Sequence, residues 1–291
     1  CTTKITRRYA PIAAYVDDLR AEIDLVAAAL GNLPAVSHVH FGGGTPNILG
    51  AGDFRAVMEH LHAAFRFGPQ TETAVEIDPR VLSHDMAEVM AAGGVTRVSI
   101  GVQDLNERVQ RAINREQPFT VVRRAVDLLR AVGSLCQALD AGRLRRNFQG
   151  YTTDTANVLL GLGASAIGEL PGGYFQNAPD TGTYRRRIAA GQLATVKGIP
   201  IDADDHRRRA VIERLMCDMT VDLDRFGGTA SFTAELARLH DMAADGLVRV
   251  DGAVVTVPED ARPLMRAVAA VFDAYLPASG TAPQARHSQA V

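Results

Sequence analysis

The chain has 291 residues, of which 47% are hydrophobic and 22% are charged, so it can build a sizeable core and is not expected to be disordered. Its formal net charge of −2 gives no general attraction to nucleic acid or acidic lipid. No apolar run is long enough to cross a bilayer, and no apolar signal segment is seen near the start. These totals predict a cytoplasmic protein without a membrane or nucleic-acid partner.

The sequence contains three cysteines, Cys1, Cys136 and Cys217, and no two of them have the spacing of a C-x2-C pair. The chain by itself therefore offers no zinc or iron–sulfur ligand set, and we predict no metal site from these residues. An odd number of widely spaced cysteines also argues against a disulfide framework and is typical of a reducing compartment.

In the N-terminal half, the hydrophobic pattern alternates between helical and strand spacing. It predicts helices at residues 9–30, 52–65, 83–94 and 105–132, the last divided at Pro118, and strands at residues 35–41, 72–78 and 96–103. Such alternation is typical of a parallel sheet covered by helices, so we expect an α/β fold.

After Gly133 the pattern changes to one short helix followed by glycine-rich and polar segments. Further along, it predicts a loop at residues 171–180, a short helix at 181–192, broken helices at 205–245, a hairpin at 246–257 and a closing helix at 259–276. The predicted organisation is a core at residues 1–133, a joining segment at 134–200, a helical domain with a hairpin at 201–277 and a disordered tail at 278–291.

Three glycines, a threonine and a proline follow the first predicted strand in the segment HFGGGTP, residues 40–46. Glycines let a backbone adopt positive φ and approach a ligand closely. Ligands of parallel α/β sheets bind beyond the C-terminal ends of the strands, which is where this segment lies. A plain flexible turn is the alternative interpretation, because glycine-rich motifs often occur without a ligand.

Polar residues also mark the ends of the next two predicted strands. Glu76 lies near the end of an apolar strand, where a carboxylate is costly unless it is paired, so it either serves a ligand, faces solvent or pairs with Arg80. Gln103 ends the third strand, and Arg115 follows in a helical stretch, where a solvated position is usual for arginine. A carboxylate, an amide, a guanidinium and an open backbone together suit a zwitterionic, ribose-bearing ligand.

The segments HFGGGTPN, EIDPR, RVSIGVQDLNERVQRAINREQ and RNFQGYTT, in this order, resemble the oxygen-independent coproporphyrinogen III oxidase (coproporphyrinogen dehydrogenase) family of radical S-adenosylmethionine enzymes. The resemblance covers nearly the whole chain before the tail. NFQGYTT and VQRAINREQ are its most specific parts and favour the oxidases over their haem-trafficking paralogues. The resemblance implies an incomplete radical S-adenosylmethionine partial (β/α) barrel with a mainly helical C-terminal domain.

The resemblance also implies an oxidoreductase of haem biosynthesis. In the family, a [4Fe–4S] cluster held by a C-x3-C-x2-C loop reduces S-adenosylmethionine, and the resulting 5′-deoxyadenosyl radical abstracts a hydrogen from a propionate of coproporphyrinogen III. Decarboxylation of two propionates to vinyl groups gives protoporphyrinogen IX. A monomer acting on coproporphyrinogen III is therefore expected.

By the same resemblance, seven residues correspond to positions that contact S-adenosylmethionine, of which the family is thought to hold two molecules: Gly43, Gly44, Thr45, Glu76, Gln103, Arg115 and Ile167. The glycines match the loop that holds the methionine end, and Ile167 in GASAIG is the weakest match. No catalytic residue is assigned.

Two departures from the family pattern bear on activity. Cys1 matches a cysteine that follows the cluster loop, which predicts that the cluster ligands and the first barrel strand are absent from this chain. A strand similar to NIDLIYGLP, with an aspartate that contacts S-adenosylmethionine, is expected after Gly133 and is also absent. Such a core would expose two apolar sheet edges. We therefore expect the chain as written not to oxidise coproporphyrinogen.

Two other functions remain open on the sequence. A non-catalytic remnant that binds porphyrin, haem or S-adenosylmethionine would use the glycine loop without radical chemistry. A nucleic-acid binder would use the helices and hairpin of residues 205–257, which resemble a winged helix, but the net charge does not support a DNA footprint.

Overall fold

The computed structural model describes residues 8–32, 35–102, 106–132, 145–147, 150–152 and 156–276, which form two compact units. Unit 1 comprises residues 1–140 and 154–199, and unit 2 comprises residues 141–153 and 200–291. The two units have separate hydrophobic cores.

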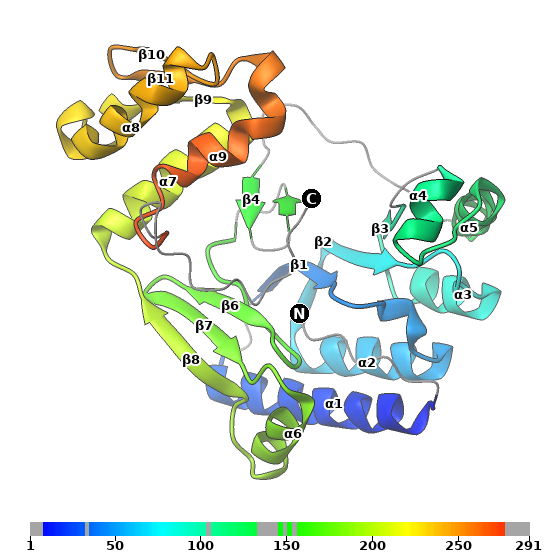
Figure 1. The fold of residues 1–291 in the computed structure, drawn as a ribbon. Helices are drawn as coiled ribbons and strands as arrows, with labels where there is room; N and C mark the ends of the chain where they lie inside the picture. The colour runs from blue at the N-terminus through cyan, green and yellow to red at the C-terminus, as the bar shows by residue number, and fades with distance from the viewer. Residues whose placement is uncertain are drawn as a thin grey trace. The chain divides into compact units, whose positions relative to one another are not determined.

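Unit 1 contains a parallel sheet with the strand order β1-β2-β3 (Figure 1). The strands are β1 (Ala35–Phe41), β2 (Arg66–Ile77) and β3 (Arg97–Ile100), and the helices are α1 (Ala10–Leu30), η1 (Pro46–Ile48), α2 (Ala51–Ala64), α3 (His84–Ala92), α4 (Glu107–Ala112) and α5 (Phe119–Ala131). The predicted alternation of helices and strands is confirmed. Local signals set the boundaries, since the Ser83 side chain accepts a hydrogen bond from the Met86 N–H (3.1 Å) at the start of α3.

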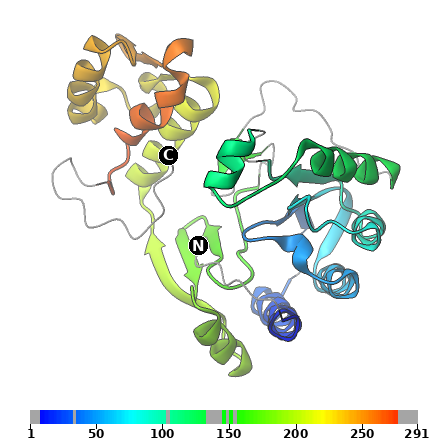
Figure 2. The ribbon, with the colours of Figure 1, turned by 45° about the vertical axis from the view of Figure 1, so that its right-hand side comes forward.

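The sheet has one apolar and one polar face. Phe41, Ile77 and Ile100 lie on the apolar face, which packs with Phe54 and Met58 of α2 in the main core. Figure 2 shows α1, α2 and α3 nearly end-on along the same side of this sheet. The opposite face carries charged and imidazole side chains: His38, His40, Glu72, Glu76 and Arg97. Alternation of side chains along a strand therefore directs all ionisable groups of the sheet away from the helices.

A second sheet of unit 1 is formed by β6 (Ile167–Leu170), β7 (Gly173–Asn177) and β8 (Thr195–Pro200), with α6 (Thr181–Ala189) between β7 and β8. The predicted loop at residues 171–180 is therefore wrong over β7. A Cβ on Gly168 would lie 2.0 Å from the Phe175 ring, so the missing side chain of one strand makes room for the aromatic ring of its partner. This packing across the hairpin is not visible in a local glycine-rich pattern.

Unit 2 is mainly helical, as predicted. Its elements are β4 (Arg145–Asn147), β5 (Gly150–Thr152), α7 (Ala203–Asp218), β9 (Thr220–Asp222), η2 (Leu223–Phe226), η3 (Thr229–Phe232), α8 (Thr233–Ala244), β10 (Arg249–Asp251), β11 (Val254–Thr256), η4 (Glu259–Leu264) and α9 (Met265–Ala270). The predicted hairpin is present as β10–β11, but β9 adds a third strand within the stretch expected to be helical. The closing helix is also shorter than predicted, because Pro263 lies within η4 and α9 begins only at Met265.

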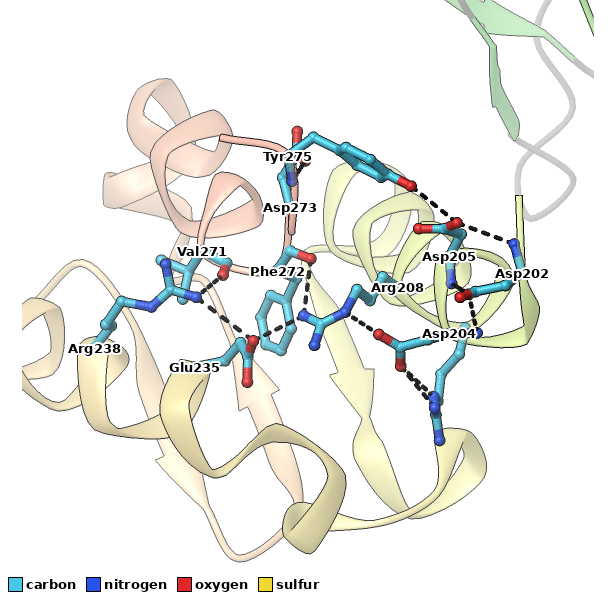
Figure 3. Close-up of polar contacts among 11 residues, drawn as sticks. Asp202, Asp204, Asp205, Arg208, Glu235, Arg238, Val271, Phe272, Asp273 and Tyr275 are labelled. Carbon is cyan, nitrogen blue, oxygen red and sulfur yellow. Dashed lines mark hydrogen bonds and ion pairs between the residues drawn. The ribbon is translucent and has the colours of Figure 1, made fainter. Parts of the chain in front are cut away.

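An arginine on α7 links three segments of unit 2 (Figure 3). The Arg208 guanidinium donates to Asp204 Oδ2 (2.6 Å), to Glu235 Oε1 on α8 (2.7 Å) and to the Phe272 carbonyl (3.4 Å). Arg238 adds a hydrogen bond to the Val271 carbonyl. Because Glu235 is buried, these charged hydrogen bonds replace the hydration that its carboxylate lost on folding.

Unit 1 depends on a buried carboxylate of α1. Glu22 is 1% exposed, and its carboxylate accepts hydrogen bonds from the Gly163 N–H (2.6 Å), from Asn177 Nδ2 (2.6 Å) and from the Tyr184 hydroxyl (2.8 Å). These donors come from a loop, from β7 and from α6, so one side chain fixes three elements to α1. Burial raises the pKa of Glu22, and the three hydrogen bonds oppose that rise.

We predict that Glu22→Gln lowers the free energy of unfolding of unit 1 by about 2–3 kcal/mol at pH 7, because the amide turns an N–H group toward a donor that loses its acceptor. Since the folded pKa of Glu22 is raised, this group makes the wild type less stable as pH increases from about 4.5 through the folded pKa, and the variant lacks that dependence. Urea unfolding between pH 4.5 and 7.5 measures both effects.

Tyr184→Phe is the matched control, because it removes one donor and leaves the carboxylate in place. A smaller loss of about 1 kcal/mol with the pH dependence retained is expected for it. Equal stability of Glu22→Gln and wild type at pH 7 would contradict the anchoring role of Glu22.

Candidate functional site

The C-terminal ends of the three parallel strands lie next to one another. Phe41 at the end of β1 pairs with Val75 of β2, and Ile77 at the end of β2 pairs with Ile100 at the end of β3. The segments that leave these ends therefore start at the same edge of the sheet, which is the usual ligand edge of a parallel sheet.

The glycine loop that follows β1 has free space beside two of its glycines and a close side-chain contact at the third. Gly43 and Gly44 have φ values of 73° and 51°, and a Cβ on either would meet no atom within 4 Å. A Cβ on Gly42 would instead lie 2.6 Å from His40 Nε2. The loop thus adopts a backbone conformation that favours glycine. It leaves open space around Gly43 and Gly44.

A buried asparagine fixes the exit of this loop to the end of β2. Asn47 is 3% exposed, its Oδ1 accepts from the Asp78 N–H (2.9 Å), and its Nδ2 donates to the Asp78 carbonyl (2.9 Å). The side chain thereby satisfies both backbone groups of one residue, as a neighbouring strand would. Sequence reasoning missed Asn47 and Asp78, although both lie in the motifs GGGTPN and EIDPR.

Glu76 lies on the polar face of the sheet and does not pair with Arg80. Its side chain is 45% exposed, with Oε1 at 3.3 Å from His40 Nε2. Arg80 instead binds Asp78 through Nε and Nη2, with distances between 2.6 and 3.1 Å. Glu76 is directed to the polar face of the sheet, whereas Asp78 follows the last residue of β2 and also accepts a hydrogen bond from the nearby Arg80 N–H.

His40 is surrounded by charged groups but is itself mostly buried. Burial lowers the pKa of its imidazole, Glu76 raises the pKa, and Arg97 lowers it. Arg97 donates to Glu72 Oε1 at 2.6 Å, and Glu72 in turn lies 3.4 Å from His38 Nδ1. The face therefore holds the His40 ring mainly neutral at neutral pH, beside the Glu76 carboxylate.

Arg115 lies in the connection after α4 and not on a solvated helix face. Its Nη2 lies 3.5 Å from the Gly101 carbonyl and 3.6 Å from Asp78 Oδ2. Its Nε is buried and has no hydrogen-bond partner among the described residues. The structure thus brings Arg115 to the edge formed by the ends of β2 and β3.

For two of the seven predicted contact residues, the described structure shows no position at the C-terminal edge of the parallel sheet. Gln103 lies outside the described residues. Ile167 is on β6, where its backbone pairs with Gln176 and its carbonyl is approached closely by Gly161, so it belongs to the antiparallel sheet. Gly43, Gly44 and Thr45 follow β1, Glu76 lies near the end of β2, and Arg115 lies in the connection after α4.

Within the described ranges, no group of three or more His, Cys, Asp or Glu side chains is arranged to hold a metal ion. Cys217 is a half-buried free thiol on α7, and Cys1 and Cys136 lie outside the described residues. None of the helices in the described part of the chain has the length and apolar character needed to cross a lipid bilayer.

Comparison with known proteins gives consistent matches. The family model of the radical SAM superfamily matches residues 1–139. An oxygen-independent coproporphyrinogen III oxidase of Bradyrhizobium diazoefficiens is 37% identical over 95% of this chain and 83% of the relative, and one of Paracoccus denitrificans is 31% identical over 96% and 84%. The solved structure of coproporphyrinogen III oxidase (HemN) from Escherichia coli, described as a radical SAM enzyme, superposes with a TM-score of 0.84 at 26% identity, covering 95% of this chain and 86% of that one.

The alignments also show that the relatives contain segments that this chain lacks. The alignment with the Bradyrhizobium protein spans 374 positions, whereas this chain has 291 residues, so at least 83 positions (374 − 291) are occupied only in the relative. Positions of that protein within the aligned range therefore have no counterpart in this chain, and the loss of a strand after Gly133 stays a prediction. The predicted junction after Gly133 lies outside the described residues.

We predict that Glu76→Gln lowers the pKa of His40 further, because the carboxylate favours the imidazolium and the amide does not. A histidine with a lowered folded pKa loses stability as pH falls from about 6.5 through that pKa, so with respect to His40 the variant should lose more stability at acidic pH than the wild type. Titration of the His40 ring by NMR measures the shift.

Glu88→Gln is the matched control, because Glu88 is exposed and pairs with His84. It should leave the His40 titration unchanged. An unchanged or raised pKa of His40 in Glu76→Gln would contradict the assigned contact.

Proposed function

Because the chain belongs to the oxygen-independent coproporphyrinogen III oxidase family of radical S-adenosylmethionine enzymes, we propose that it serves the oxidative decarboxylation of coproporphyrinogen III to protoporphyrinogen IX in anaerobic porphyrin biosynthesis. Family membership carries this proposal. When bound together, S-adenosylmethionine and a reduced [4Fe–4S] cluster supply the 5′-deoxyadenosyl radical that begins the reaction.

The residues at the strand ends fit S-adenosylmethionine. A Cβ on Gly43 or Gly44 would meet no atom within 4 Å, the Glu76 side chain is 45% exposed, and the buried Arg115 Nε–H finds no acceptor among the residues that the structure describes. A buried donor of this kind is costly unless a ligand or water accepts from it. These observations support the proposal that this edge binds a charged ligand with several hydrogen-bonding groups.

We assign each of these residues a part in binding. The loop backbone at Gly43, Gly44 and Thr45 would hold the methionine end, Glu76 would accept from a hydroxyl or amino group, and Arg115 would donate to an oxygen of the ligand. Gln103 and Ile167 remain proposed contacts on the resemblance alone. All seven assignments are proposals.

The cysteines of the chain do not fit a [4Fe–4S] cluster. Cys1, Cys136 and Cys217 do not form a C-x3-C-x2-C motif, and the described residues offer no other ligand group. No step is therefore derived through a cluster held by these residues. As a second function, the formed glycine loop would bind S-adenosylmethionine, porphyrin or haem without catalysis.

Further properties expected from the sequence also remain proposals. These are a cytoplasmic location, a monomeric state, the absence of a nucleic-acid partner, and the four-part organisation at residues 1–133, 134–200, 201–277 and 278–291. The last of these parts lies outside the described residues.

We predict that the 291-residue protein binds S-adenosylmethionine and that Gly44→Val weakens binding about tenfold, because a β-branched residue is strained at positive φ by about 1–2 kcal/mol. Equilibrium dialysis with labelled S-adenosylmethionine measures the affinity. Gly52→Ala on α2, where an added Cβ meets nothing, is the control and should bind as wild type does. No binding by wild type would overturn the proposed site.

We further predict that this chain by itself forms no 5′-deoxyadenosine with iron, sulfide and reductant. If the protein nevertheless serves the oxidase reaction in cells, cells that lose the gene accumulate coproporphyrin III when grown without oxygen. Chromatography with mass spectrometry measures both compounds. Formation of 5′-deoxyadenosine would show that the chain holds a cluster through other ligands. An unchanged porphyrin profile in the deletion strain, with S-adenosylmethionine binding intact, would favour the binding function over the oxidase.

A further inference from the structure

Two buried carboxamides bind the backbone of two loops at the candidate site in the same way. Asn47 makes a pair of hydrogen bonds to the N–H and carbonyl of Asp78, both 2.9 Å long. Gln110 on α4 makes the equivalent pair to Gln117, accepting from its N–H (2.8 Å) and donating to its carbonyl (2.9 Å). Both carboxamides are nearly fully buried, so each loop is fixed by hydrogen bonds that water does not weaken.

The two fixed loops carry the two partners of one ion pair. The backbone that Asn47 holds carries the Asp78 carboxylate, and the loop that Gln110 holds carries Arg115, whose N–H donates to the Gln110 carbonyl (2.8 Å). Asn114, just before Arg115, has a φ of 52°, a conformation that asparagine tolerates better than most residues. Asp78 Oδ2 and Arg115 Nη2 then lie 3.6 Å apart.

The electrostatics favour a charged Asp78. Burial raises the pKa of the Asp78 carboxyl group. Hydrogen bonds from Arg80 and the positive charges of Arg80 and Arg115 lower it more, so the pKa lies below its ordinary value. Its side chain is 8% exposed, so its attraction for Arg115 is screened less than that of a surface pair. Arg115 is thus anchored at Nη2 by Asp78 and Gly101, while its buried Nε has no hydrogen-bond partner in the described part of the chain.

We infer that Asp78, with its backbone fixed by Asn47, is a positioning residue that holds the Arg115 guanidinium so that its Nε–H is presented to bound S-adenosylmethionine. This inference rests on the proposed function for the identity of the ligand. The orientation of Arg115 by Asp78 is a property of the chain itself. A purely structural role, in which Asp78 only caps the turn at Arg80, is the alternative.

The test is a double-mutant cycle on S-adenosylmethionine affinity with Asp78→Asn, Arg115→Gln and the double variant. Asp78→Asn removes the charge but keeps the size of the side chain. The hydrogen bonds from Asn47 remain possible in this variant because they are made to the backbone of residue 78. We expect Asp78→Asn to weaken binding about fivefold in the wild type and to have no further effect when Arg115 is already replaced. Equal losses in both backgrounds, or no loss in the wild type, would overturn the inference.

Arg80→Gln is the matched control, because it removes the stronger hydrogen-bond partner of Asp78 without touching Arg115. It should leave S-adenosylmethionine affinity within about twofold of wild type. A loss as large as that of Asp78→Asn would assign the effect to the turn and overturn the positioning role.

A second measurement does not depend on ligand binding. Phenylglyoxal modifies free guanidinium groups, and peptide mass spectrometry reads the rate at Arg115. Modification should be faster in Asp78→Asn than in wild type and unchanged in Arg80→Gln. If wild type binds no S-adenosylmethionine, the proposed function fails, and this rate still decides the inference: equal rates at Arg115 in Asp78→Asn and wild type overturn it.

Discussion

The pair of hydrogen bonds between the Asn47 side chain and the backbone of Asp78 sets the geometry on which the candidate site depends. It joins the exit of the glycine loop to the end of β2, two segments 31 residues apart in the chain. Because the bonds are buried, the loop at Gly43 and Gly44 keeps its open conformation without a side chain to support it. The backbone that Asn47 holds carries the Asp78 carboxylate, which binds Arg80 and lies 3.6 Å from Arg115 Nη2.

The two faces of the parallel sheet separate the hydrophobic core from the ionisable side chains. The apolar face packs against α1, α2 and α3 and supplies much of the hydrophobic stabilisation of unit 1. The polar face gathers imidazole, carboxylate and guanidinium groups at strand positions two residues apart, so that no ionisable side chain of the sheet needs to enter the core. Substitutions on the polar face can therefore change binding with a smaller effect on folding than substitutions on the apolar face.

The chain has the fold of an oxidase family in a shorter sequence than its relatives. Its relatives in Bradyrhizobium and Paracoccus align over more positions than this chain has residues. The strand ends that carry the glycine loop, Glu76 and Arg115 are nevertheless formed, because β1, β2 and β3 are adjacent both in sequence and in the sheet. A binding edge of this kind needs only neighbouring strands, whereas a cluster needs its own ligand loop.

The sequence by itself determined the alternation of helices and strands in unit 1, the hairpin of unit 2, the family, and the motifs that carry the candidate site. These depend on local periodicity, on glycine and proline signals and on motif residues, which are all readable along the chain. Only the tertiary structure decided that Glu76 contacts His40, that Arg80 pairs with Asp78, and that β7 is a strand. Partners of a side chain are set by neighbouring strands and by buried contacts such as Asn47 to Asp78, and these lie tens of residues away in the sequence.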